Sequence, residues 1–349
     1  VQEITEQIEE QSGISVNIKN FHFKFPDKIC LQKAQIKIPN YNQLLYAEEL
    51  HLNFSFWNLL KKRIISDYLK INGLEFKVHI LEDGTSNIDF LKNLQFSGNG
   101  LSKINIKTID IEDCTIAFDN DQKSKKEHQL FDPNHFLIKH FNATILLNEY
   151  VKNKLNASIE SLSFEEKSGL QLTGLSTKID LSEQNLIIPN FKIELNNSKI
   201  ETDTIKLSFE QISDIFKQQK NVLIQATLKP SNILPPDLKS LHPILANFKK
   251  TVYFEGNLGG TLDSISFNNL DFEYEQELHL KGNLQLTNLQ KNLSDIYVSA
   301  NIERLKFSVY GLQDIIASAQ KKPLMLPDEL YNLGTCLYTG NIQGHFRNL

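Results

Sequence analysis

One short pattern of apolar residues recurs seven times along the chain: two apolar residues separated by two others, then a third after one more. Side chains of a β-strand point alternately to opposite faces, so a strand with one apolar face keeps its apolar residues at even spacing. The three-residue step breaks that phase, and the strand needs a bulge or bend there to return its apolar side chains to the same face. The seven copies are Ile18–Phe23, Ile71–Phe76, Ile106–Ile111, Ile159–Phe164, Ile188–Ile193, Phe267–Phe272 and Ile302–Phe307. We therefore expect a repetitive β structure with one continuous apolar face.

Most of the chain is predicted to form strands separated by short polar turns, such as those at 25–28 and 83–84. Sequential strands with short turns are typical of antiparallel meanders. Helices are predicted only in short stretches: 1–13, one turn near 57–62, 86–94, 211–220, within 236–249, and 312–320. We predict a mainly all-β fold, an elongated and curled antiparallel repetitive sheet that forms an open apolar groove, with a short N-terminal helix and a few small helices.

A longer repeat bears on domain organisation. The segment Phe254–Ile265 aligns with Tyr338–Leu349, and each copy follows a Leu-Pro segment. The second copy stops where the first continues, and residue 1 is Val, so we expect a fragment of a longer repetitive protein. Prolines at 230, 235, 236 and 243 predict a boundary near residue 230. The expected domains are a helix at 1–13 after a removed membrane anchor, a first β-groove segment at 14–230, and a second at 231–349, truncated within a repeat.

Composition and charge exclude some function classes. The net charge is −5, and arginine occurs only at positions 63, 304 and 347, so no basic stripe for nucleic acid is present. No run of about 18 apolar residues that could span a membrane occurs. The apolar fraction of 40% suits strands with one wet face rather than a thick core. The Gly-rich stretch 256–260 lacks the Lys-Ser/Thr of a phosphate loop, and no catalytic motif is found, which favours a protein that is not an enzyme.

The cysteines and histidines predict no metal or disulfide. Cys30, Cys114 and Cys336 each stand alone in a separate strand-like run, without metal-ligand spacing, and we expect them to form no disulfide with one another. Four histidines lie between apolar strand residues and are predicted on the polar face: His22, His51, His79 and His279. Three others fall around a charged segment with Asp132 and are predicted in a solvated loop: His128, His135 and His140. No cofactor and no metal site is predicted.

The apolar face has two alternative fates. It can close on its own side chains as the filled core of a sandwich or stalk, or it can line a groove that holds another molecule. Abundant phenylalanine, 22 residues, and few helices to cover the face favour the groove. The filled core corresponds to a structural or scaffold module.

Several segments resemble the amino-terminal region of AsmA/TamB-like proteins. They are Gly13–Ile18, Phe21–Pro26, Leu44–Leu50, Leu69–Leu74 and, most specifically, Asp83–Leu91 with its Asp-Gly…Asn-x-Asp-Phe pattern. The strands Gly256–Leu262 and Leu280–Leu286 are similar to later repeats of that family. The resemblance covers nearly the whole chain, and the composition rich in Asn, Lys and Ile but poor in Arg suggests a Bacteroidetes-type member.

The resemblance implies a periplasmic protein that is anchored in the inner membrane by an upstream helix. Its function would be bridge-like transport of phospholipid or another acyl-chain lipid between the inner and outer membranes through an apolar β groove, with a role in outer-membrane assembly. A BamA-like barrel is the implied partner of a carboxy-terminal region absent here. An alternative is a scaffold for outer-membrane protein assembly with such a barrel, with a self-filled β core and no lipid carriage. The residues expected to line the groove are Phe21, Phe23, Phe54, Phe76, Ile109, Ile111, Leu162, Phe164, Phe191, Ile193, Phe209, Leu270, Phe272, Leu305 and Phe307.

Overall fold

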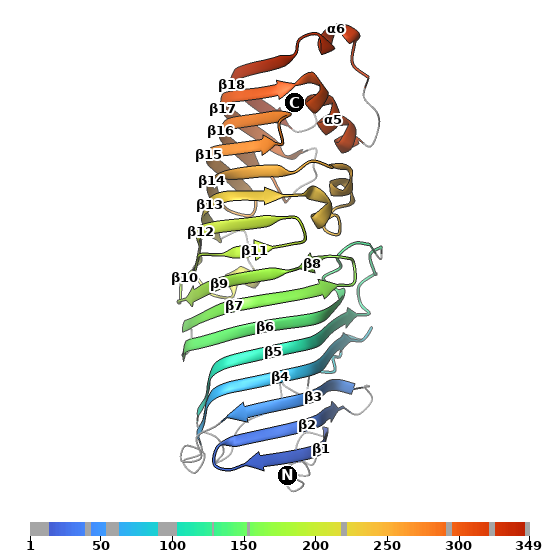
Figure 1. The fold of residues 1–349 in the computed structure, drawn as a ribbon, viewed down its shortest axis with the longest axis vertical. Coiled ribbons are helices and arrows are strands. Elements are labelled where there is room, and N and C mark those ends of the chain that lie inside the picture. The colour runs from blue at the N-terminus through green and yellow to red at the C-terminus, as the bar shows by residue number, and fades with distance from the viewer. Residues whose placement is uncertain are drawn as a thin grey trace. The chain divides into compact units, whose positions relative to one another are not determined.

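The chain folds into two compact units made mainly of β-strands, as the computed structural model shows (Figure 1). It describes residues 14–38, 43–53, 63–89, 103–127, 129–151, 154–217, 222–290, 295–320 and 325–345. Unit 1 comprises Val1–Tyr150 with Ala157–Thr173, and unit 2 comprises Val151–Asn156 with Gly174–Leu349. The prediction of a mainly antiparallel β fold with few helices is confirmed.

Unit 1 is a sheet in which β1 to β6 pair in chain order. Its strands are β1 (Ser15–Lys24), β2 (Lys28–Lys37), β3 (Gln43–Asn53), β4 (Arg63–Ile80), β5 (Lys103–Asn120), β6 (His135–Val151), β7 (Lys154–Glu166) and β8 (Gln171–Leu172). The prediction that sequential strands pair as antiparallel meanders is wrong at one place, because β4 and β5 are parallel. The physical reason is the length of their connection, residues 81–102, since only a long connection returns the chain to the end at which it started.

Unit 2 is an antiparallel sheet. Short strands β10 and β11 each pair with β9 and with β12. Strands β12 to β18 then follow as a meander in strict chain order (Figure 1). The bounds are β9 (Gly174–Leu181), β10 (Asn185–Pro189), β11 (Lys192–Glu194), β12 (Lys199–Ser208), β13 (Leu223–Ile233), β14 (Val252–Gly260), β15 (Ser264–Tyr274), β16 (Leu278–Thr287), β17 (Tyr297–Ser308) and β18 (Thr335–His345). Residue 230, where the sequence predicts a boundary, lies inside β13, which pairs with both β12 and β14. The division between the units falls instead at residues 150–174.

The predicted bulges are present in β15 and β17, whereas the pairings of β1 with β2 and of β3 with β4 keep their register through the steps at Ile18–Phe21 and Ile71–Leu74. In β15 the pairing with β16 shifts register between Phe267 and Leu270, and Asn269 takes a positive φ of 52°. In β17 the pairing with β18 shifts between Ile302 and Leu305. Each extra residue returns the following apolar side chains to the face that the preceding ones occupy.

A glycine faces these bulges on the alternate strands β14, β16 and β18. Gly256, Gly282 and Gly340 have φ values of 147°, 154° and 151°, a conformation that residues with a Cβ rarely adopt. A Cβ on Gly282 would lie 2.2 Å from the backbone oxygen of Asn301 in β17. Each of these glycines is followed by Asn and then by Leu or Ile, so a short repeated motif marks the close approach of two backbones.

The helices are short and lie mostly where the sequence predicts them. They are α4 (Asp214–Lys217), the 3₁₀ helices η2 (Pro235–Leu238) and η3 (Pro243–Asn247), α5 (Val309–Gln320) and α6 (Asp328–Tyr331). Residues 87–89 form turns rather than the start of a helix. The helices predicted at 1–13 and 57–62 lie outside the described residues, as does Phe54. Within the described part of the chain, no helix is both long and apolar enough to cross a bilayer.

Candidate functional site

The most extended chemical feature of unit 2 is its row of large apolar side chains across successive strands. The ladder places Phe254 opposite Phe272, Phe272 opposite Leu280, Leu280 opposite Leu305, and Leu305 opposite Tyr338. Side chains directly opposite one another share a face and lie about 5 Å apart. Five strands therefore present one continuous apolar row.

Two parallel rows extend this face. One passes from β14 to β18 on the far side of the bulges, through Leu258, Phe267, Leu284, Ala300 and Ile342. The other passes from β15 to β18 through Tyr274, Leu278, Phe307 and Cys336. The bulges and glycines keep the rows on the same face, so the face is several side chains wide as well as five strands long.

Unit 1 carries a comparable face whose bend is lined by small residues. Ala34 lies opposite Ala47, Ala47 opposite Leu74, and Cys114 opposite Phe141. Ala47 and Cys114 have no exposed surface, and the Leu74 N–H donates to the Cys114 sulfur at 3.4 Å. On four strands the residue just before this position has a positive φ: Lys33 before Ala34, Gly73 before Leu74, Asp113 before Cys114 and His140 before Phe141. Small residues fit the crowded inner side of such a bend.

Most large apolar side chains on these faces are only partly covered, although Leu270, Tyr274 and Ile302 are buried. Among the phenylalanines whose side chains the structure describes, Phe209 alone is buried, with 6% exposure. The largest side chains that are fully buried in the described chain are those of His135, Cys114, Ser66 and Ser240, none of them large and apolar. A self-filled β core would instead bury phenylalanine and leucine most completely.

The predicted lining residues fall into three groups. Phe272, Leu305 and Phe307 belong to the unit 2 rows just described. In unit 1, Phe76 of β4 lies opposite Ile116 of β5, while Ile109 and Ile111 of β5 lie opposite Leu69 and Ile71 of β4. Phe21 and Phe23 of β1 are exposed, at 43% and 46%. The third group is covered to different extents. Leu162 and Phe164 of β7 and Phe191 and Ile193 at β11 are half-buried, whereas Phe209 and Leu270 (8% exposed) of unit 2 are buried.

The opposite face of each sheet is polar and carries the predicted surface histidines. His79 pairs with Asp121 at 2.8 Å and His279 with Asp271 at 2.6 Å, each on a strand whose neighbouring residues face the apolar side. Similar cross-strand ion pairs join Lys70 to Glu112. These partly exposed pairs contribute little to stability individually, but they keep this face wet.

The prediction of a solvated loop is wrong for two residues. His135 is the first residue of β6 and is 2% exposed, because its ring is hydrogen-bonded to Asp119 and to the Lys123 carbonyl. Asp132 is also buried and accepts from the backbone N–H groups of Lys126 and Asn134. His140 is exposed, but it lies within β6 rather than in a loop, and His128 lies outside the described residues.

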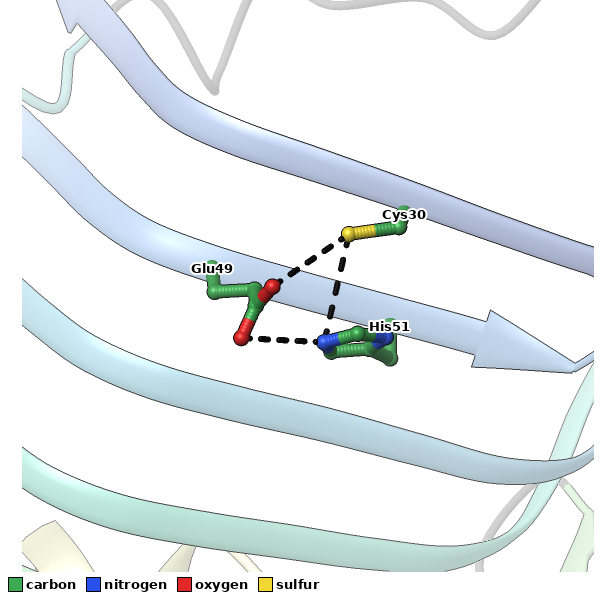
Figure 2. Close-up of side chains that lie close together, drawn as sticks. All are labelled: Cys30, Glu49 and His51. Atoms are coloured by element: carbon green, nitrogen blue, oxygen red, sulfur yellow. Dashed lines mark hydrogen bonds and ion pairs between the residues drawn. The ribbon is translucent and has the colours of Figure 1, made fainter. Parts of the chain in front are cut away.

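One polar-face cluster was not predicted. Cys30 on β2 meets Glu49 and His51 on β3, as Figure 2 shows. The ladder places Cys30 directly opposite His51, while Glu49 is two residues before His51 and therefore on the same face. Aligning the apolar positions of β2 and β3, Ile29 with Leu52 and Leu31 with Leu50, would have given this register. Cys30, Cys114 and Cys336 are free thiols.

Comparisons with known proteins found no matching family model, curated protein or solved structure. The resemblance to AsmA/TamB-like proteins therefore rests on the sequence segments given above.

Proposed function

We propose that the chain binds the acyl chains of phospholipids or similar lipids along the apolar faces of its sheets. The observation that carries the proposal is the partial exposure of large apolar side chains, with Phe209 the only buried phenylalanine among those described. Surfaces of this kind mark binding sites when they are contiguous. The unit 2 rows are contiguous across five strands.

The free energy of this interaction is large enough to matter. Burying a methylene group contributes about 0.8 kcal/mol, so a sixteen-carbon chain contributes roughly 13 kcal/mol when it leaves water. A floor of many equivalent apolar side chains holds the chain without a single tight site, so the lipid can slide. The headgroup can remain in water at the edge of the sheet. Because the rows repeat with the strands, the same interaction recurs along each unit.

The biological setting proposed here follows the family resemblance. In that setting the protein is periplasmic, is held in the inner membrane by an upstream anchor, and carries lipid toward the outer membrane. A BamA-like barrel would meet a region outside this chain. Catalysis has no place in the proposal, since sliding requires no bond to change.

The test compares two adjacent residues of β16 that face opposite ways. Leu284 lies in an apolar row, whereas Asn283 lies on the polar face, where its Oδ1 accepts from the Asn269 N–H at 3.0 Å. Leu284→Asp and Asn283→Asp introduce the same charge, and the Asp at 283 keeps an accepting oxygen. We expect Leu284→Asp to reduce transfer of a fluorescent phospholipid between vesicles at least about fivefold, and Asn283→Asp to leave it unchanged.

A photo-crosslinking residue at Phe272 is the direct readout. It should capture lipid from membranes, whereas the same group at Asn283 should not. The filled-core scaffold predicts the reverse pattern: no capture at Phe272, and a loss of several kcal/mol in the free energy of unfolding for Leu284→Asp because a charge is buried without a partner. Chemical denaturation of the three proteins decides between these outcomes.

A further inference from the structure

Cys30, Glu49 and His51 bring a sulfur, an oxygen and a nitrogen donor to one point of the polar face (Figure 2). The Cys30 Sγ lies 3.5 Å from Glu49 Oε1 and 3.9 Å from His51 Nε2. His51 Nε2 lies 3.1 Å from Glu49 Oε2. All three side chains are half-buried and come from neighbouring strands of a regular ladder, so their positions are fixed by backbone pairing rather than by a loop.

This triangle of donors has the size that a tetrahedral zinc ion requires. Zinc–sulfur bonds of about 2.3 Å and zinc–nitrogen or zinc–oxygen bonds of about 2.0–2.1 Å place sulfur about 3.6 Å from its neighbours, and nitrogen about 3.4 Å from oxygen. The sulfur–nitrogen separation of 3.9 Å is close to this value, while the carboxylate of Glu49 approaches the sulfur with Oε1 at 3.5 Å and the imidazole with Oε2 at 3.1 Å. One oxygen of Glu49, the sulfur and the imidazole nitrogen all lie within 4.8 Å of one another. Small rotations of the side chains would therefore complete the coordination.

The surroundings orient the ligands. Gln32 Nε2 donates to Glu49 Oε1 at 3.1 Å, a hydrogen bond of the kind that holds ligating carboxylates in place. That bond, followed by the one with His51, lowers the pKa of Glu49 to about 2, so its carboxylate is charged at neutral pH. On the other side of Cys30 the ladder places His22 of β1, so a second histidine lies on the same face of the sheet.

We propose that Cys30, Glu49 and His51 form a binding site for zinc or a similar borderline-soft divalent metal ion, which would join β2 to β3. A mixed set of thiolate, imidazole and carboxylate favours such ions over magnesium or calcium, which take oxygen ligands alone. The second cluster of possible ligands, His79 with Asp119 and Asp121, lacks sulfur, and Asp119 is already engaged by His135. The proposal is independent of lipid binding.

Binding would release a proton from Cys30. A cysteine thiol carries its proton at neutral pH, and only the thiolate binds a metal ion. The metal ion displaces this proton and forms the metal–sulfur bond. Affinity should therefore increase with pH.

Cobalt(II) titration of the whole chain under reducing conditions tests the site, because cobalt bound to a thiolate gives a charge-transfer absorption that oxygen and nitrogen ligands do not. We expect one equivalent of cobalt to produce this band and one equivalent of zinc to abolish it. Cys30→Ser and His51→Ala should each weaken zinc binding at least about 100-fold in competition with a chromophoric chelator. Cys336→Ser and His279→Ala, which alter the same residue types in unit 2, should leave it unchanged.

Circular dichroism of each variant separates loss of binding from loss of fold. Cys30 and His51 are partly exposed, so both variants should keep the spectrum of the parent protein. Absence of the charge-transfer band, or a band that persists in folded Cys30→Ser, would overturn the proposal. If one of these variants fails to fold, Glu49→Gln replaces it, because this change removes the ligating charge and keeps the shape of the side chain. Metal binding that survives Glu49→Gln would also contradict the proposed site.

Discussion

Gly282 offers the sharpest test of how the apolar face is built. It lies in the middle of β16 with φ 154°, and a Cβ there would lie 2.2 Å from the Asn301 backbone oxygen and 3.1 Å from the Ile302 Cα. Holding a residue with a Cβ in this backbone conformation costs about 1–3 kcal/mol. Moving the Asn301 carbonyl away would also weaken a ladder hydrogen bond worth about 1 kcal/mol. We therefore expect Gly282→Ala to lower the free energy of unfolding by about 2–4 kcal/mol.

Gly259 of β14 is the matched control. A Cβ at Gly259 would meet only the Ser266 hydroxyl, at 3.7 Å, which is an ordinary contact. Gly259→Ala should be neutral or stabilise the protein by about 0.4–1 kcal/mol, because alanine restricts the unfolded chain. Urea denaturation followed by circular dichroism measures both changes. Equal stability of the two variants would refute the idea that glycine is required at the position opposite a bulge.

Two further outcomes follow from buried residues of unit 1. Ala47→Leu should lower the free energy of unfolding by about 1–3 kcal/mol in urea denaturation, because Ala47 has no exposed surface at the bend. Ala300→Leu, on the half-buried row of unit 2, should lower it much less. If the two variants lost similar stability, the idea of a crowded bend would be contradicted. The hydrogen bond with Asp119 raises the pKa of His135 above its ordinary 6.5, so the stabilisation is fully present below pH 6.5 and is lost as pH rises through the raised value. His135→Gln should therefore destabilise more at about pH 5.5 than at about pH 9 in urea denaturation, and a loss that is independent of pH would count against this role.

Local features of the fold could be predicted from the sequence. The apolar spacing around Phe267–Phe272 and Ile302–Phe307 gives the strands, their faces and the bulges, because side-chain direction depends only on neighbouring residues. The repeated Gly-Asn pairs at 256, 282 and 340 also carry a signal, since only glycine tolerates the close backbone approach. The apolar rows follow from these positions once adjacent strands are paired.

Features that depend on distant residues could not be predicted. The parallel pairing of β4 with β5 and the division near residues 150–174 follow from how long connections return, which no local pattern specifies. His135 is buried because Asp119, on a different strand, accepts its hydrogen bond. The cluster of Cys30, Glu49 and His51 requires the register of β2 against β3, and the sequence separation of its members hides it from motif spacing.

The parallel pair of β4 and β5 has a consequence for how unit 1 reaches its native state. Strands β1 and β2 are joined by the three-residue turn 25–27, which closes quickly. The first contact between the parallel strands β4 and β5 must instead close a loop of 40 residues. Loop-closure entropy increases by about 0.6 kcal/mol per doubling of length, so this step costs roughly 2 kcal/mol more than the hairpin. Each paired residue of β4 and β5 is also about 40 positions apart, a separation that slows folding. The parallel pair β4–β5 therefore divides unit 1 into a hairpin-rich part that forms quickly and a part whose assembly sets the folding rate.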